Sequence, residues 1–359
     1  MMFVAAVENF ILFSMLLSVV SFALACAVRR VVARGGFEPH PHLLSRLYAA
    51  AVVIPPAASA WLVSAALLPE SWLGEAAFKA SHPAPLHELH LLGDLTAALE
   101  PALSYFTISF VTAAALFAAG SSVRGCLRIG GVVERLEVNA LPPPPEQLTL
   151  VERTAARCGL KVGLVMSDYP FSFVWGFYRS KLILSSGLLR VLTPEELTGV
   201  LEHEAAHHAR RDNLIKLSLA LCGYASPAFP LSRLVLRWRT EQIEMVCDEV
   251  AVAYTETPLE IAGALVKLRR QTLVNSGFSQ AFSSGFIPED THSFERRVRR
   301  IVSLADSLPT PEEVSTLSRL RRGEAALVLL IFAGTLSVIS LLSPLAVHEA
   351  AESLIQLIK

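Results

Sequence analysis

Four long apolar stretches constrain this chain more than any other feature of its sequence. A helix needs about 20 mostly apolar residues to cross the hydrocarbon core of a membrane. The stretches that meet this requirement are residues 10–28, 47–68, 102–120 and 325–345. Composition agrees, because 53% of the residues are hydrophobic and only 18% are charged, against about 25% charged in soluble proteins. The sequence therefore predicts four membrane-spanning helices.

The first stretch also has the length of a secretory signal peptide. Its N-terminal flank carries Glu8 and no basic residue, whereas Arg29 and Arg30 follow it. A signal peptide has the opposite order of charge and a small-residue cleavage site. The sequence therefore favours a retained helix over a cleaved leader.

The basic residues between the stretches orient the chain. The first loop carries four arginines against one glutamate, and the second carries one lysine against five acidic residues. Arginines also follow the third stretch and precede the fourth. Positive charges stay on the cytoplasmic side. We therefore expect a multi-pass protein of the inner (cytoplasmic) membrane, with its N-terminus outside and residues 121–324 in the cytoplasm.

The predicted organisation places one compact domain between the third and fourth spans. The expected parts are three spans in residues 1–122, a proline-containing linker at 123–145, the domain at 146–322, and the fourth span with a short tail at 323–359. Residues 146–158 read as a helix, and residues 162–167 and 182–185 read as short strands. The predicted fold class is mainly α with a small β-sheet.

A strong helix start precedes the most informative motif of the chain. Thr193 can cap the helix, Pro194 suits its first position, and Glu196 lies where a capping box needs a carboxylate. The helix then runs into His203-Glu204-Ala205-Ala206-His207. Histidines four residues apart stand on one helical face.

Two imidazoles at this spacing can bind one zinc ion, and an adjacent carboxylate can take a proton from a zinc-bound water. Glu204 has that place between His203 and His207. The alternative is a surface helix that carries two histidines by chance. Apolar Leu197 and Leu201 on the preceding turns favour a site close to a buried face. We therefore predict one Zn²⁺ per chain.

A third protein ligand must come from elsewhere in the sequence. Arg210 and Asn213 occupy the positions where the metzincin pattern needs glycine and histidine, so that class is excluded. A later helix at residues 240–254 carries four acidic residues, of which Glu244 and Asp248 face the same way. One of them can bind zinc while the other anchors a histidine. A solvated acidic face is the alternative for this helix.

Residues 203–213 and 244–249 together resemble the integral-membrane zinc metallopeptidases of the bacterial β-lactam-receptor (antirepressor) type. These are related to the gluzincins known as the heat-shock membrane protease and the CAAX prenyl protease. The resemblance covers roughly residues 169–304 and the spans on either side. It implies the following roles: His203, His207 and Glu244 as zinc ligands, Glu204 as general base, and Asp212 and Asp248 in support.

The resemblance also implies where a substrate would lie. It assigns a substrate-pairing edge strand to Phe173, Val174, Trp175 and Gly176, because exposed strand edges pair with extended peptides. His292 occupies the place of a residue that stabilises the transition state. The relatives have proline after it, whereas this chain has Ser293, so a surface histidine is the alternative.

These observations favour a zinc-dependent endopeptidase that hydrolyses a cytoplasmic or membrane-proximal protein. Two alternatives stay open: a signalling protease that cleaves itself or one transcriptional repressor, and a non-catalytic membrane scaffold. A net charge of −1 does not indicate a nucleic-acid partner. No penicillin-binding segment follows the last predicted span, so β-lactam sensing is not expected.

Residues 214–236 form a further apolar stretch that is nearly long enough to span. One crossing there would put Glu244 on the opposite side from His203, and two crossings need about 40 residues. We therefore expect helices buried in the domain or lying along the membrane surface. The five cysteines show no pairing pattern and are expected to be reduced thiols.

Overall fold

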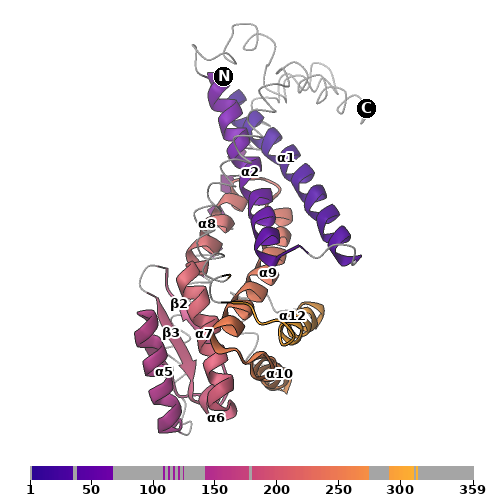
Figure 1. Cartoon of the computed structure of the whole chain (residues 1–359). Helices are drawn as coiled ribbons and strands as arrows, with labels where there is room; N and C mark the ends of the chain where they lie inside the picture. The colour runs from indigo at the N-terminus through magenta and orange to yellow at the C-terminus, as the bar shows by residue number, and fades with distance from the viewer. Residues whose placement is uncertain are drawn as a thin grey trace.

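The computed structural model describes residues 2–34, 39–67, 142–177, 180–274 and 291–310, with isolated positions between 108 and 124 and at 313. Figure 1 shows two long helices at one end and a domain around a small sheet at the other. The described chain is mostly helical, with one sheet of three strands. The predicted fold class is confirmed.

Helices α1 (Met2–Ala33) and α2 (Pro41–Leu67) pack against each other and contain the first predicted span and residues 47–67 of the second. Their segments Phe10–Ala33 and Pro41–Trp61 are long and apolar enough to cross a membrane, with mean hydropathies of 2.5 and 1.4. The third predicted span, 102–120, is described only at isolated helical positions. The fourth, 325–345, lies outside the described residues.

The apolar stretch 214–236 forms a helical hairpin from α8 (Asp212–Tyr224) and the first part of α9 (Phe229–Thr255). The hairpin packs on α1 and α2 (Figure 1) instead of being enclosed by the domain. Ser226, in the turn, lies 2.9 Å from Ser18 Oγ and donates to the carbonyl of Ser14 at 3.3 Å. Both partners lie inside the apolar segment of α1.

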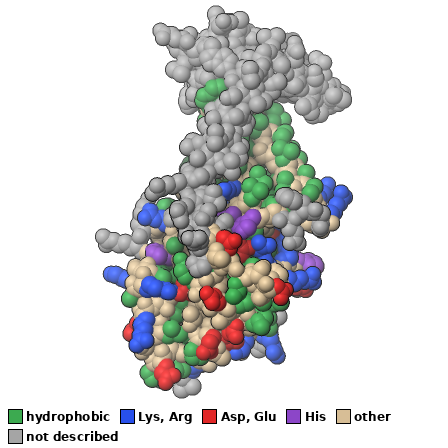
Figure 2. All heavy atoms as spheres, viewed as in Figure 1, with side chains coloured by type: hydrophobic (Ala, Val, Ile, Leu, Met, Phe, Trp, Pro, Cys, Tyr) green, Lys and Arg blue, Asp and Glu red, His purple; other side chains and the backbone are tan. Residues whose placement is uncertain are grey.

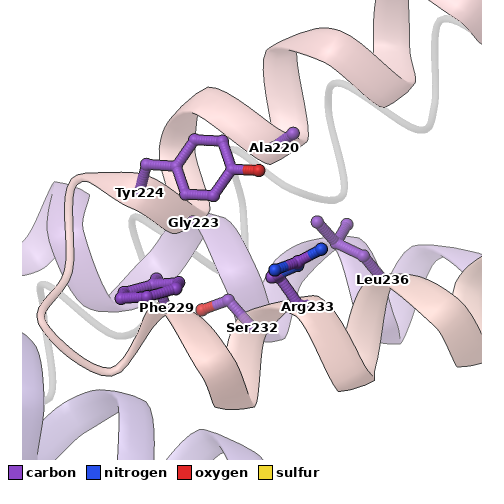
Figure 3. Close-up of a pocket in the computed structure, with 7 residues that line it drawn as sticks. All are labelled: Ala220, Gly223, Tyr224, Phe229, Ser232, Arg233 and Leu236. Atoms are coloured by element: carbon purple, nitrogen blue, oxygen red, sulfur yellow. The ribbon is translucent and has the colours of Figure 1, made fainter. Parts of the chain in front are cut away.

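The two legs of this hairpin approach closely near its tip. A methyl group on Gly223 would lie 3.1 Å from Ser232 Cβ on α9 and 3.6 Å from a methyl group of Val52 on α2. Figure 3 shows the small pocket that remains between the legs, with the rings of Tyr224 and Phe229 on its rim. These two rings meet edge to face, with centroids 6.2 Å apart. Small residues thus allow three helices to meet at the tip.

Trp238 of α9 connects the base of the two long helices to the domain. Its ring stacks on Phe22 of α1 at 5.8 Å and packs against Tyr48 of α2 at 5.9 Å. The guanidinium of Arg29 lies 4.9 Å from the centre of the same ring and pairs with Glu241 at 3.1 Å. A tryptophan beside an arginine is typical of the boundary between membrane and water.

The sheet has the order β1-β3-β2 and is formed by β1 (Lys161–Val165), β2 (Ser172–Trp175) and β3 (Lys181–Ser185). β1 runs parallel to β3, and β2 runs antiparallel to it. The two strands predicted from sequence are confirmed with boundaries within two residues. β2 is an edge strand of this sheet, as the resemblance implied.

The core of the domain forms where helices cover the sheet. α5 (Pro145–Cys158) and α7 (Pro194–Arg210) pack together beside β3, and Leu197 and Leu201 of α7 are fully buried there. The other helices of the described domain are α6 (Ser186–Val191), α10 (Pro258–Val274) and α12 (Thr291–Ser303). The predicted capping box is confirmed, because Thr193 and Glu196 exchange both hydrogen bonds.

The contact between α7 and α10 depends on Gly199. A methyl group at this position would lie 2.5 Å from Ile261 Cγ1 on α10, which is shorter than any stable contact. Gly199→Ala is expected to lower the free energy of unfolding by about 1–3 kcal/mol, because overpacking moves the two helices apart. In an Ile261→Ala background the same change should cost much less. Equal costs in both backgrounds, measured by denaturant titration, would contradict this contact.

Candidate active site

Three side chains from two helices converge at one point. His203 and His207 of α7 approach each other with their Nε2 atoms 3.2 Å apart. Glu244 of α9 places its two oxygens 3.5 Å from His203 Nε2 and 3.6 Å from His207 Nε2. In a tetrahedral zinc site with bonds of about 2.0–2.1 Å, neighbouring ligand atoms lie ~3.3 Å apart. The donor set and its spacing therefore fit one zinc ion.

Each imidazole is held from behind by a carboxylate. His203 Nδ1 lies 2.9 Å from Asp248 Oδ1, and His207 Nδ1 lies 3.0 Å from Asp212 Oδ2. These hydrogen bonds leave both Nε2 atoms turned toward Glu244. Carboxylates in this position fix the ring orientation and raise the basicity of metal-binding histidines. Of the two acidic residues that sequence left open, Glu244 faces the Nε2 atoms and Asp248 contacts the outer nitrogen.

The two supporting carboxylates are themselves paired with arginines. Arg297 of α12 is buried and binds Asp248 with two hydrogen bonds of 2.8 and 2.9 Å. A third nitrogen of Arg297 lies 3.4 Å from Glu244. Arg210 at the end of α7 pairs with Asp212 at 3.2 Å. Buried charges without such partners would be strongly destabilising, so the arginines make this cluster of charges compatible with the interior.

Electrostatics shift the pKa values of these groups in opposite directions. Burial would lower the pKa of His203, but hydrogen bonds to Asp248 and Glu244 outweigh it and raise the value above 6.5. Desolvation would likewise lower the pKa of His207, but Cys247, Glu244 and Asp212 outweigh it and raise the value well above 6.5. Burial would raise the pKa of Glu244, but His207, His203 and Arg297 hold it well below 4.5. The acidic groups therefore favour the protonated form of each imidazole, and the imidazoles with Arg297 favour the ionised form of Glu244.

Glu204 follows His203 on α7 and is not one of the three converging side chains. It is buried. Ser172 of the edge strand β2 donates a hydrogen bond to its Oε1 atom at 2.8 Å. This contact holds the carboxylate toward the strand where the resemblance places a substrate.

The strand β2 is attached to the site by a second side chain. Asn213, near the start of α8, donates from Nδ2 to the carbonyl of Val174 at 2.7 Å and to that of Gly176 at 3.3 Å. Residues 173–175 lie in β2 as expected, and Gly176 ends the strand with a φ of 105°. The carbonyls of Val174 and Gly176, which belong to the predicted substrate edge, therefore already accept hydrogen bonds from Asn213.

A second group of possible metal ligands shares His207. Its Nδ1 atom lies 3.5 Å from Cys247 Sγ, and Asp212 completes the group. Burial raises the pKa of the Cys247 thiol to about 11, whereas metal binding needs a thiolate. Cys247 is also completely buried. The group at His203, His207 and Glu244 has three deprotonatable donors and partial exposure, so it suits a metal with an open position better.

His292 is not brought into this group. It lies exposed on the first turn of α12, and within the described residues no contact joins it to the two histidines of α7. Arg297 of the same helix makes the contacts with Asp248 and Glu244 instead. Ser172 and Asn213 were not singled out as site residues, because their contacts join segments more than 30 residues apart in sequence.

The opposite pKa shifts predict how stability depends on pH once metal is removed. His203 and His207 have raised folded-state values, so their pairs stabilise the fold fully below about pH 6.5 and lose this contribution as pH rises through the raised values. The melting temperature of protein stripped with a chelator should therefore fall as the pH rises above 6.5 and through the raised values. Zinc-loaded protein should not show this fall, since zinc binds neutral imidazole. A chelated protein whose melting temperature is constant or rises over this range would contradict the assignment.

Comparison with known proteins gives matches over the segment that contains this site. Residues 149–271 match the model of peptidase family M48. A protease HtpX homolog of Methanocaldococcus jannaschii is 32% identical over 124 residues, which cover 33% of this chain and 41% of the relative. The HtpX homolog of Gemmatimonas aurantiaca is 28% identical over 159 residues, covering 34% and 57%.

A third relative, protease HtpX homolog 1 of Sulfurisphaera tokodaii, is 32% identical over 142 residues, covering 37% of this chain and 45% of the relative. The chain spans about half the length of the curated relatives it matches. No solved structure gives a significant match. The relation to the heat-shock membrane protease that the motifs implied is confirmed: residues 149–271 match the model of peptidase family M48, and this chain is similar to protease HtpX homologs.

Proposed function

We propose that this protein is a membrane-embedded zinc endopeptidase of the gluzincin type, with His203, His207 and Glu244 as the zinc ligands and Glu204 as the general base. The observation that carries the proposal is the spacing of 3.2–3.6 Å among the donor atoms of the three ligand side chains, with the Nδ1 atoms already held by carboxylates. A non-catalytic scaffold would not require this spacing, nor a carboxylate beside it.

When bound, zinc would polarise the scissile carbonyl and lower the pKa of a water molecule to about 7. The Glu204 carboxylate accepts the proton of the attacking water at Oε and returns it to the nitrogen of the departing amine, as a general base and then acid does. Ser172 keeps this carboxylate beside β2 by its 2.8 Å hydrogen bond. Asp212 and Asp248 keep the imidazoles oriented throughout.

The proposed membrane placement follows from α1 and α2. Only 17% of the apolar window of α1 is buried in the protein, so most of this helix presents apolar side chains outward. Figure 2 shows apolar side chains on the described upper surface and charged ones over the domain below. We place these helices across the inner membrane with the domain in the cytoplasm. This proposal also includes two further spans, at 102–120 and 325–345. It includes the domain boundaries 1–122, 123–145, 146–322 and 323–359.

The structure also supports a site close to the membrane surface. Ser18 lies eleven residues before Arg29, which is ~16 Å along a helix and about half of a ~30 Å hydrocarbon core. The hairpin turn contacts Ser18, and the thirteen-residue α8 leads from there back to Asp212 over ~20 Å. The zinc ligands would therefore lie within roughly 10 Å of the cytoplasmic surface. Peptide bonds of cytoplasmic or membrane-proximal proteins are accessible at that height.

The relatives are named as proteases, and neither their names nor the geometry favours a repressor as the substrate. The alternative of a protease that cleaves a repressor therefore has no separate support here.

Glu204→Gln tests the proposed mechanism. The amide cannot take a proton from water, so cleavage of a β-casein probe should fall by about 10²- to 10⁴-fold, while zinc content measured by metal analysis stays at one per chain. Glu202→Gln is the matched control, because Glu202 lies on the same helix and pairs with Arg157 away from the histidines. Full cleavage by Glu204→Gln would contradict the mechanism.

The topology is tested with reporter fusions. Alkaline phosphatase, which is active only outside the inner membrane, should be inactive when fused after Cys247 and active when fused after Lys79 in the second loop. Activity after Cys247 would place Glu244 outside and would be incompatible with both the topology and the zinc site.

A further inference from the structure

The edge of β2 that faces away from β3 has a defined set of backbone groups. The amide of Ser185 donates to the carbonyl of Phe171 at 3.0 Å, so the residues at 171, 173 and 175 face β3. Because backbone groups alternate along a strand, Ser172 and Val174 turn their N–H and C=O groups to the opposite edge. An extended peptide that pairs with β2 must use these outward groups.

Asn213 occupies one end of this edge. Its Nδ2 group donates to Val174 O at 2.7 Å and to Gly176 O at 3.3 Å. An incoming amide needs these same carbonyl lone pairs and the same space. The outward groups of Ser172 lie at the other end of the strand, beside Glu204. A side chain therefore binds the carbonyls at the Val174–Gly176 end, whereas the Ser172 end lies next to the proposed general base.

The position of Asn213 is determined by the junction between α7 and α8. Arg211 has a left-handed φ of 53°, which ends α7 and starts α8. The next residue, Asp212, contacts His207, and Asn213 contacts β2. Two consecutive side chains, Asp212 and Asn213, therefore fix the position of α7 relative to the edge strand β2.

We propose that Asn213 is a positioning residue that closes the Val174–Gly176 end of the edge, so that an extended substrate pairs with β2 only beside Ser172. The proposal rests on the proposed endopeptidase function. It limits recognition to a short stretch of substrate backbone next to the scissile bond, and it predicts that removing the Asn213 side chain lengthens the paired stretch.

The test uses two series of peptide hydroxamates, in which the zinc-binding group is extended residue by residue toward either the N- or the C-terminal side. In the wild type, affinity should stop improving when the series that runs toward Val174 reaches this residue. In Asn213→Ala the same extension should improve the inhibition constant by about three- to tenfold, as expected for one added hydrogen bond. With β-casein, KM should fall while kcat is kept, because the added binding is uniform.

Ser218→Ala is the matched control on α8, since Ser218 is exposed and donates a hydrogen bond to the carbonyl of Leu214 on its own helix. Asn213→Ser, whose hydroxyl is too short to reach β2, should reproduce the effect of Asn213→Ala. The same dependence on length in wild type and both variants would overturn the proposal. Loss of affinity for the shortest hydroxamate in both variants would also overturn it, because Asn213 would then act only through the fold. If no hydroxamate inhibits the wild type, the proposed function itself fails.

Discussion

Two hydrogen bonds between imidazoles and carboxylates are the interactions on which the rest of this site depends. Asp248 and Asp212 hold the outer nitrogens of His203 and His207, so both inner nitrogens face Glu244. Without them each ring could rotate, and the spacing of 3.2–3.6 Å would be one of several arrangements. Such buried charges are costly in isolation. Arg297 and Arg210 offset this cost by pairing with the same carboxylates.

The helix α9 connects this cluster to the membrane part. Its 27 residues extend over ~40 Å. Toward one end Trp238 and Glu241 contact Arg29 of α1, and one to two turns further on Glu244 and Asp248 reach the histidines. Arg296 of α12 also pairs with Glu241, at 2.8 Å. One continuous helix therefore sets the height of the zinc ligands above the proposed membrane surface.

Sequence periodicity predicted the parts of the site that lie on single helices. The spacing of His203 and His207 and the capping box at Thr193 are local features, and the structure has them in place. The choice between Glu244 and Asp248 could not be made from the helix, because both face the same way. In the structure the two residues differ in their contacts with α12, because Arg297 makes a bidentate pair with Asp248.

Other contacts were beyond local patterns altogether. Ser172, Asn213 and Cys247 reach the site from segments whose approach depends on tertiary packing. The apolar stretch 214–236 was expected inside the domain or along the membrane surface, whereas it packs on α1 and α2. It is too short for two full crossings, but a hairpin that reaches only to Ser18 needs fewer residues. Gly223 and Ser226 indicate a helical hairpin only when α1 and α2 are known to lie beside them.

The central claim is that one zinc ion binds between α7 and α9. X-ray absorption at the zinc edge of the purified, zinc-loaded protein tests it most directly. The structure predicts four nitrogen or oxygen ligands at about 2.0–2.1 Å, two of them imidazoles, and no sulfur. A zinc–sulfur distance of about 2.3 Å would place the metal at Cys247, Asp212 and His207 instead, and would contradict the account.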